Sequence, residues 1–189
     1  MISIIYGGNT SGTCYELYQH ILHQIPKQQR YDIFLQQSNI DFLLTTGYHA
    51  PLSSQQQIWI NQLEASSTLI FIYPLYWFNV TPILKSFIDQ TFWPEHAFSF
   101  KNKQYFRNGL WKGKKAIIIY TQGGPEILHR FKGRLGYKVM KYPLNLSGIY
   151  DISVLHLDNL NRSATDNKKV VASMANIAQK VKQLIRNTV

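Results

Sequence analysis

Short apolar runs alternate along the chain with segments of helical periodicity. Five runs rich in β-branched and aromatic residues have the composition of buried strands: Ile2–Tyr6, Tyr31–Leu35, Leu69–Tyr73, Ala116–Tyr120 and Ile152–Leu157. Between or after them, apolar residues recur three or four positions apart, as one face of a helix requires: Cys14, Leu17, Ile21 and Ile25; Leu84, Phe87, Ile88 and Phe92; Val171, Met174, Ala178, Val181 and Ile185. This alternation predicts an α/β fold.

The near-continuous apolar character of the strands predicts a parallel sheet covered by helices on both faces. Five strands fit the flavodoxin-like, doubly wound order 2-1-3-4-5, in which ligands bind at the carboxyl ends of strands 1 and 3. Ser163–Asp166 has capping-box spacing and predicts the start of the last helix. The segment Phe98–Leu110, with its asparagines and glycine, predicts an excursion before strand 4.

Composition favours one compact domain over residues 1–189. Hydrophobic residues make up 45% of the chain and charged residues 16%, and we find no internal repeat, low-complexity tract or linker. Met1 leads directly into apolar residues without a basic leader, and no apolar run approaches the roughly 20 residues of a membrane-spanning helix. Cys14 is the only cysteine, which excludes an intrachain disulfide. We therefore expect a cytoplasmic protein.

The formal charge of +10 indicates anionic partners. Lysine and arginine are spread from Lys27 to Arg186 without a nucleic-acid-binding motif, so we do not expect nucleic acid as a partner. The charge suits a phosphorylated cofactor, an anionic membrane surface or an acidic protein. It argues against a pure electron-shuttle flavodoxin, because such shuttles are usually acidic.

The first candidate binding loop follows strand 1 directly and leads into a helix. Its glycines, hydroxyls and helix N-terminus suit an anion such as a phosphate, which nominates Asn9, Thr10, Ser11, Gly12 and Thr13. A tight glycine turn with a hydroxyl N-cap accounts for the same residues without any ligand.

The second candidate loop follows strand 3 and contains Pro74, Leu75, Tyr76, Trp77 and Phe78. Large aromatics at the carboxyl edge of a sheet can flank a planar ring, and Pro82 at the first position of the next helix marks where the loop ends. The alternative is that these aromatics belong to the core or to an interface.

The third candidate loop, after strand 4, contains Thr121, Gln122, Gly123 and Gly124. Glycines without side chains let the backbone approach a flat ring, and its amides can stabilise negative charge on that ring. A plain glycine turn before a helix starting at Pro125 is the alternative interpretation.

The residues from Pro74 to Asp89 resemble the P-L-x-W-F and P-x-x-L-K-x-x-x-D signature of NAD(P)H:quinone oxidoreductases of the flavodoxin-2 type. The resemblance continues through His96–Phe100, Leu110–Lys115 and Thr121–Pro125, and so covers nearly the whole chain. Relatives include DT-diaphorase-like enzymes, a drug-activity modulator and ancillary subunits of potassium efflux systems. The resemblance implies a flavin cofactor, FMN with FAD as the alternative, and NAD(P)H as co-substrate.

It also implies that the second and third loops contact the isoalloxazine ring. Gln122 stands where relatives commonly have a second threonine, and Ser11-Gly12 departs from the usual phosphate loop. His129 falls close to a position where relatives carry a tyrosine, so His129 and Tyr76 are the candidate catalytic residues, although a surface histidine fits His129 as well.

Taken together, the sequence predicts two-electron, ping-pong reduction of quinone-like acceptors by NAD(P)H. The resemblance implies a homodimer, and a second apolar surface is expected at Phe98, Phe100, Tyr105 and Phe106. The main alternative is a flavin-binding regulatory subunit of a potassium efflux transporter, peripheral at the inner face of the membrane; a one-electron flavodoxin is the third.

Other chemistry finds little support in the sequence. No Ser-His-Asp order or paired-carboxylate motif stands out, so hydrolysis is not expected. His20 and His23 lack a third ligand nearby, and we expect exposed helix residues rather than a metal site. Cys14 has the apolar spacing of a small core residue.

Overall fold

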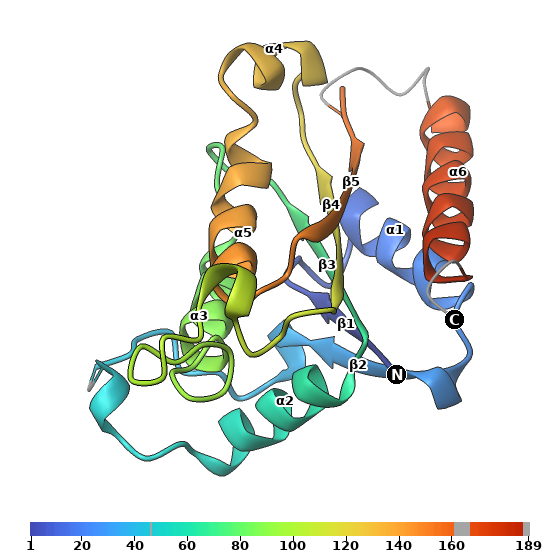
Figure 1. Ribbon diagram of the computed structural model, residues 1–189. Coiled ribbons are helices and arrows are strands. Elements are labelled where there is room, and N and C mark those ends of the chain that lie inside the picture. Colours follow the sequence, from blue (N-terminus) through green and yellow to red (C-terminus); the bar gives the residue numbers. More distant parts are fainter. Residues whose placement is uncertain (46, 161–166, 187–189) are drawn as a thin grey trace.

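The structure is a computed structural model that describes residues 1–45, 47–160 and 167–186 (Figure 1). One parallel sheet in the order β2-β1-β3-β4-β5 gathers the five strands. They are β1 (Ile2–Tyr6), β2 (Arg30–Phe34), β3 (Thr68–Pro74), β4 (Lys115–Thr121) and β5 (Asp151–Leu157). The predicted fold and strand order are therefore confirmed.

Helices cover both faces of this sheet. In Figure 1, α1 (Thr13–Leu22) and α6 (Asn167–Arg186) lie on one side, and α2 (Ser54–Ala65), α3 (Pro82–Thr91) and α5 (Leu135–Leu146) lie on the other. The short α4 (Glu126–Phe131) stands beyond the carboxyl end of β4. Four single 3-10 turns complete the described elements: Lys27–Gln29, Leu35–Gln37, Gly47–His49 and Phe106–Asn108.

Alternation along the strands divides the apolar residues into two cores. Ile70 and Ile72 of β3 pack with the buried residues of α1 and α6, whereas Phe71 and Tyr73 pack with those of α2, α3 and α5. Successive side chains of a strand point to opposite faces, so a strand covered on both sides is apolar throughout. The fully buried β3 has this pattern, and the burial fixes the register of the sheet.

The start of α3 is tied to the loop after β1 through Thr81. Its hydroxyl donates a 2.6 Å hydrogen bond to the carbonyl of Gly7 and, as the helix N-cap, accepts one from the amide of Leu84. A Cβ on Gly7 would lie 2.8 Å from the Cβ of Leu84, so this close approach requires glycine. The loops after β1 and β3 are thus held at a fixed separation.

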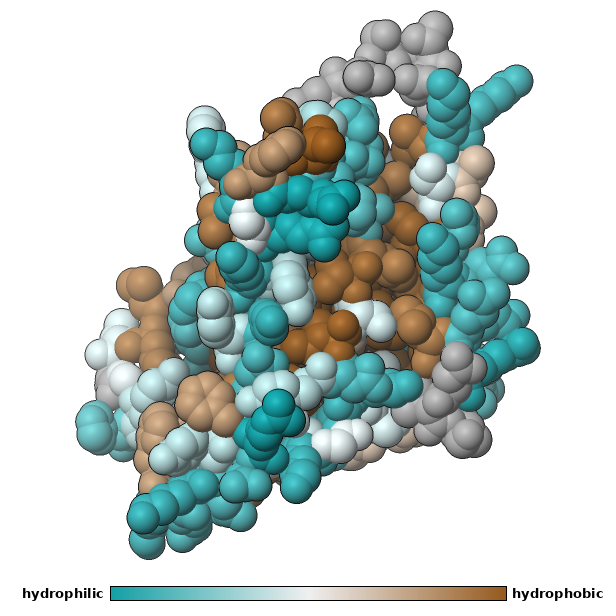
Figure 2. All heavy atoms as spheres, turned by 45° about the horizontal axis from the view of Figure 1, so that its top comes forward, coloured by the Kyte–Doolittle hydropathy of each residue, from teal (hydrophilic) through white to brown (hydrophobic). Residues whose placement is uncertain are grey.

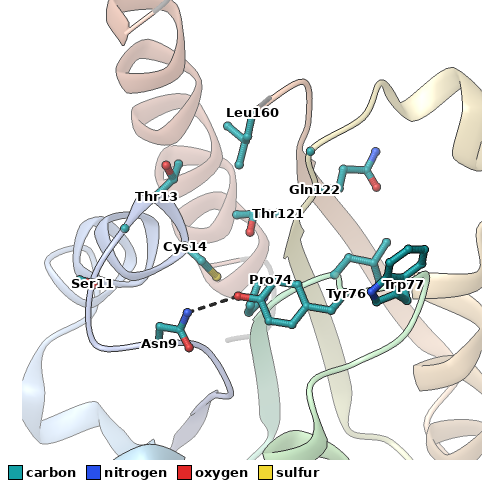
Figure 3. Close-up of a pocket in the computed structure, with 13 residues that line it drawn as sticks. Asn9, Ser11, Thr13, Cys14, Pro74, Tyr76, Trp77, Thr121, Gln122 and Leu160 are labelled. Carbon is teal, nitrogen blue, oxygen red and sulfur yellow. Dashed lines mark hydrogen bonds between the residues drawn. The ribbon is translucent and has the colours of Figure 1, made fainter. Parts of the chain in front are cut away.

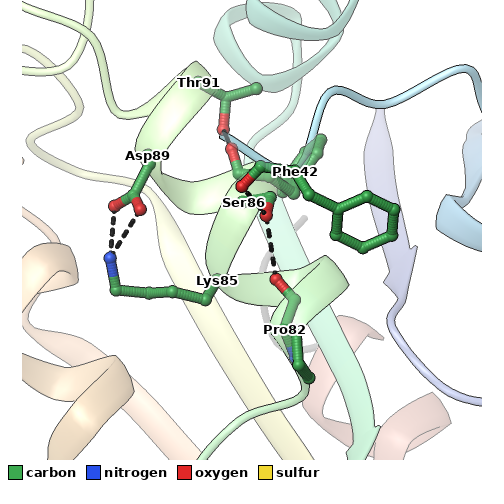
Figure 4. A network of polar contacts seen from close by, with 7 residues as sticks. Phe42, Pro82, Lys85, Ser86, Asp89 and Thr91 are labelled. Atoms are coloured by element: carbon green, nitrogen blue, oxygen red, sulfur yellow. Dashed lines mark hydrogen bonds and ion pairs between the residues drawn. The ribbon is translucent and has the colours of Figure 1, made fainter. Parts of the chain in front are cut away.

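The lysine and aspartate of the α3 signature form an ion pair on the surface of the helix. Nζ of Lys85 lies 2.5 Å from Oδ1 of Asp89, one helical turn away (Figure 4). Exposed pairs of this spacing contribute about 0.3–0.5 kcal/mol, so the pair supports the helix only modestly. On the same helix the hydroxyl of Ser86 donates to the carbonyls of Pro82 and Phe42, which links α3 to the loop after β2.

Several local predictions differ from the structure. β2 begins at Arg30 and ends at Phe34, so Leu35 lies in a 3-10 turn, and Ile25 is buried beyond the end of α1. Apolar spacing does not indicate α2, because Gln56 takes a buried position while Ile58 is exposed. A capping box between Ser53 and Gln56 defines its start. The predicted cap Ser163–Asp166 lies outside the described residues.

The predicted excursion before β4 is present as a compact loop. Ser99 and Gln104 form an isolated antiparallel bridge within it. The rings of Phe100, Tyr105 and Phe106 follow one another at 5.7–5.8 Å. Phe98, expected at the surface, is instead buried against the core on the α3 side, because it returns to the end of α3 through a bridge with Pro94.

Candidate functional site

A cavity of about 640 Å³ opens at the carboxyl ends of β1, β3 and β4, where the three predicted loops meet. The loops contribute side chains and backbone from separate elements, and Figure 3 shows them around one space. The lining residues are Asn9, Ser11, Gly12, Thr13, Cys14, Pro74, Leu75, Tyr76, Trp77, Thr121, Gln122, Gly123 and Leu160. None of them carries a charged side chain.

The amino end of α1 faces this cavity without a side-chain cap. Gly12 is the N-cap residue, with φ of 87°, and no side chain of the described residues caps the first turn. The alternative in which a hydroxyl caps this helix is therefore not what the structure shows. The first backbone amides of a helix lack intrahelical partners and carry partial positive charge, so they can bind an anion. Ser11 and Thr13, at this end of the helix, also line the cavity (Figure 3).

The aromatic loop is a two-residue hairpin turn built from Trp77 and Phe78. Tyr76 and Asn79 exchange backbone hydrogen bonds of 2.9 and 3.1 Å, and the two residues between them have φ of 50° and 62°. Positive φ at both central positions is the pattern of the type I′ turn, which normally carries Asn-Gly. Each non-glycine residue in this region costs about 1–2 kcal/mol. The turn places Trp77 at the cavity in this strained conformation, and its side chain is 95% exposed there.

A side-chain hydrogen bond joins the first and second loops. Nδ2 of Asn9 donates to the hydroxyl of Tyr76 at 3.3 Å (Figure 3). The carbonyl of Asn9 in turn accepts a 2.7 Å hydrogen bond from the hydroxyl of the buried Tyr6. A Cβ on Gly8 would lie 2.4 Å from that hydroxyl, so glycine is needed there. Asn9 thus connects the strand 1 loop to a wall of the cavity.

The third loop is fixed by backbone hydrogen bonds to its neighbours. The amide of Leu75 donates to the carbonyl of Thr121 at 2.8 Å, and the amide of Gln122 donates to the carbonyl of Leu157 at 2.9 Å. Asp158 accepts a 2.7 Å hydrogen bond from the amide of Glu126 and so satisfies the first turn of α4. A Cβ on Gly124 would meet no protein atom within 4 Å, so no packing within the chain demands glycine there.

Gln122 presents a buried acceptor with no partner. Its Nε2 donates to Glu126 at 3.1 Å, and Glu126 also accepts from Nε of Arg134 at 2.8 Å. The side-chain oxygen Oε1 is buried and accepts no hydrogen bond from any described residue. An unsatisfied buried acceptor costs about 1–3 kcal/mol, which a donor from a bound ligand would relieve. The Nε2 contact assigns the oxygen as the free end of the amide.

Cys14 lines the cavity as well as the core, a role its spacing alone did not indicate. Burial raises the pKa of its thiol to about 11, while hydrogen bonds from Thr121 and Tyr6 act in the opposite direction. Burial likewise raises the pKa of Tyr6 far above its ordinary value. Both groups therefore stay protonated and neutral at physiological pH. The floor of the cavity is uncharged on this side.

Four residues nominated from the sequence lie outside the cavity lining: Thr10, Phe78, Gly124 and His129. Phe78 and His129 contact each other, with ring centroids 5.0 Å apart, and so connect the aromatic loop to α4. Leu160, after β5, joins the lining although no motif marked it. Its amide donates to the carbonyl of Gln122 at 3.4 Å, so it follows the strand 4 loop.

His20 and His23 are exposed on and just beyond α1. Among the described residues no group of three or more histidine, cysteine or acidic side chains is placed to hold a metal ion. No helix in the described part of the chain is long and apolar enough to cross a membrane.

The fold and the site define a class of protein: a doubly wound α/β domain with its ligand cavity at the carboxyl ends of β1 and β3. The sequence model of the flavodoxin-2 family, described as a flavodoxin-like fold, matches residues 2–181. The chain belongs to this family.

Similar proteins include an FMN-dependent NADH:quinone oxidoreductase of Shewanella oneidensis, 30% identical over 115 residues, which are 60% of this chain and 55% of the relative. A ribosyldihydronicotinamide dehydrogenase [quinone] of Mus musculus is 27% identical over 129 residues, 65% of this chain and 54% of the relative. The matches thus span only about half the length of these curated relatives.

Among solved structures, an FMN-dependent NADH-azoreductase from Bacillus anthracis in complex with FMN has a TM-score of 0.78 at 16% identity, covering 97% of this chain and 98% of that chain. An NAD(P)H:quinone oxidoreductase from Methanothermobacter marburgensis has a TM-score of 0.76 at 15% identity, covering 97% and 96%. At these identities the likeness supports the fold alone.

Proposed function

We propose that the protein is an FMN-dependent oxidoreductase that uses NAD(P)H to reduce quinones or similar small electrophiles. The observation that carries the proposal is the cavity itself, which combines an uncapped helix N-terminus with aromatic and glycine loops. The names of the Shewanella and mouse relatives point to the same chemistry.

The lining residues fit a flavin mononucleotide. The amides at the start of α1, with Ser11 and Thr13, would hold the phosphate, and no described lining residue adds a cationic side chain. The aromatic loop and the glycine loop would hold the ring, and the orphaned Oε1 of Gln122 suits a ring N–H donor. A volume of about 640 Å³ lies within the range of cofactor sites. FMN is favoured over FAD because, among the described residues, the cavity lining includes no further residues set apart for an adenosine.

When bound, FMN supplies the hydride acceptor and donor. The chain's own residues position the reactants: Trp77 and Tyr76 would wall the space above the ring, where NAD(P)H and then the acceptor bind in turn. One shared position implies a ping-pong sequence. Neutral Cys14 and Tyr6 beneath the cavity leave its charge to the backbone amides.

Tyr76 and His129 are the proposed proton-handling residues. The hydroxyl of Tyr76 already binds Asn9 at the cavity, so it can donate to an acceptor oxygen from a fixed position. His129 stands behind Phe78, at its 5.0 Å ring contact, and would act at the rim rather than in the cavity.

We also propose that residues 1–189 act as one domain that assembles into a homodimer in the cytoplasm. One apolar surface suited to a second copy combines the excursion and α5, which contact each other, and includes the exposed residues Phe100, Phe106, Leu110, Tyr142 and Tyr150. A lone buried cysteine is in keeping with a reducing compartment. A monomeric mass by light scattering would contradict the dimer.

The decisive experiment begins with the absorption spectrum of the purified protein and chromatography of its extracted cofactor. Turnover of NADH and of NADPH with menadione then follows, with initial rates at several fixed quinone concentrations. Parallel double-reciprocal lines support ping-pong transfer. A colourless protein that FMN does not reconstitute contradicts the proposal, and FMN binding with negligible turnover supports the transporter-subunit alternative instead.

A further inference from the structure

We infer that α4, the turn after it and the first turn of α5 dock the protein on a bilayer that contains anionic lipids, with the mouth of the cavity facing the membrane. The docking surface, called here the α4 patch, consists of the exposed apolar residues Ile127, Leu128, Phe131 and Leu135 with the cations Arg130, Lys132 and Lys138. This goes beyond the proposed function, since docking needs neither flavin nor turnover.

The apolar part of the α4 patch is unusually open. Phe131 is 84% exposed, and Ile127 and Leu128 are each 57% exposed, on a helix of six residues. Figure 2 shows hydrophobic side chains gathered over α4 with hydrophilic ones around them. A short projecting element with apolar tips can insert into the interfacial region of a bilayer, where its polar flanks stay hydrated.

The charge around these tips is mainly positive. Between Glu126 and Asp151 the chain contains no acidic residue, whereas Arg130, Lys132 and Arg134 fall within five positions. Lys138 brings a further cation to the turn after α4, because its Nζ lies next to Gly133, 3.1 Å from where a Cβ would stand on that glycine. Glu126 is already bound by Arg134 and Gln122. In the described part of the chain no salt bridge engages Arg130 or Lys132.

This charge pattern favours a bilayer over a second copy of the chain. A two-fold interface centred on α4 would place the same cations against one another without a compensating carboxylate. Anionic headgroups provide the opposite charge, and each cation near such a surface contributes about 1 kcal/mol of attraction. The apolar tips and the cations then act on one partner together.

The position of α4 beside the cavity gives membrane docking a functional consequence. Through the contact of His129 with Phe78, α4 adjoins the aromatic loop whose Trp77 lines the cavity. A protein docked through the α4 patch would open its cavity toward the membrane, so lipophilic quinones dissolved there could enter it directly. This last step rests on the proposed function, whereas the docking itself does not.

The test is flotation of the full chain with vesicles of phosphatidylcholine alone and of an equal mixture of phosphatidylcholine and phosphatidylglycerol. We expect binding to the mixed vesicles only, weakened by added salt. Phe131→Ser should lower the partition coefficient about tenfold, and Arg130→Gln with Lys132→Gln about thirtyfold. Circular dichroism and menadione turnover in solution should stay at wild-type values for both variants.

The chain offers matched controls. Leu43 is 71% exposed but lies in the segment 31–84, which contains no lysine or arginine, so Leu43→Ser should leave vesicle binding unchanged. Lys101→Gln with Lys103→Gln removes two exposed cations away from α4 and should have at most the weak effect of net charge.

Several outcomes overturn the proposal. They are absence of wild-type binding to the mixed vesicles, equal loss in the control variants, or a Phe131→Ser protein whose solution mass falls, which would show that a second copy covers the patch. Absence of vesicle binding with full menadione turnover rejects docking and leaves the proposed function intact. Loss of flavin with intact vesicle binding rejects the proposed function and leaves the docking proposal intact.

Discussion

The amide of Asn9 and the hydroxyl of Tyr76 meet at 3.3 Å across the cavity, although 67 positions separate them in the chain. The contact joins the loop expected to hold a phosphate to the loop expected to hold a ring. It therefore sets the distance between the two parts of the proposed cofactor site before any ligand arrives, which lowers the cost of ordering on binding.

We accordingly expect Tyr76→Phe to weaken FMN binding while leaving the fold unchanged. Loss of one hydrogen bond of this kind should raise the Kd about threefold to tenfold, measured by fluorescence titration of the apoprotein. Tyr48→Phe, at a similarly exposed tyrosine away from the cavity, is the control. Asn9→Ala should have the same effect as Tyr76→Phe, and the double variant should be no worse than either; additive losses would show that the contact is not what matters.

Gly12 allows a separate test of the α1 N-terminus. At φ of 87° an alanine is strained, yet its Cβ would meet no atom within 4 Å, so the substitution acts through the backbone alone. We expect Gly12→Ala to lower the free energy of unfolding by about 1–3 kcal/mol and to raise the Kd for FMN more than tenfold.

Gly113 gives the matched comparison, because its φ is 88° and its Cβ position is equally open, far from the cavity. Gly113→Ala should lose the same stability in urea unfolding and bind FMN as the wild type does. If both variants lose FMN affinity equally, the effect is one of stability and the phosphate assignment fails.

Trp77 lines the cavity in a backbone conformation that tryptophan disfavours. It occupies a left-handed conformation while burying almost none of its surface, so the chain gains little from the aromatic ring itself. Trp77→Asn should stabilise the protein by about 1 kcal/mol, because asparagine tolerates this conformation, and should lower kcat/KM for menadione.

Lys103 supplies the control for this prediction. It is exposed with φ of 55° in the excursion before β4, away from the cavity, so Lys103→Asn should gain similar stability without loss of turnover. A Trp77→Asn protein that is less stable than the wild type in urea would show that the ring packs against something the strain argument omits.

The sequence was sufficient for the placement of the three loops, for a topological reason. Once alternating strands and helices indicate a parallel sheet, the carboxyl ends of β1, β3 and β4 must share one edge. Asn9, Tyr76 and Gly123 could therefore be expected around one cavity although nothing local connects them, and the structure places them there.

The pattern of hydrophobic and polar residues does not predict the backbone conformation of single loop residues, nor burial that depends on tertiary contacts. No propensity predicts Trp77 and Phe78 at positive φ, since aromatic residues rarely adopt it. Leu160 enters the cavity through a loop after β5 that carries no motif. The aromatic content of the segment predicts Phe98 at the surface, whereas a bridge to Pro94 turns it into the core.

Cys14 provides the last prediction, and its being the only cysteine makes the measurement clean. Burial raises the pKa of its thiol from an ordinary value of 9.0 to about 11. Alkylation by iodoacetamide should therefore keep accelerating up to about pH 11 in the native protein but level off near pH 9 in urea, because the thiolate is the reacting form. FMN should slow the native reaction further, since Cys14 lines the cavity.

The same shift has a consequence for stability. Between pH 9 and pH 11 the native state retains a proton that the unfolded state has lost, so this group's contribution to the free energy of unfolding falls by about 1.4 kcal/mol per pH unit as the pH rises through that window. Tyrosines titrate in the same range, and the difference between the wild type and Cys14→Ala isolates the thiol. Identical pH profiles of urea stability for the two proteins would show that the thiol titrates alike in the folded and unfolded chain, and would remove Cys14 from the neutral floor of the cavity.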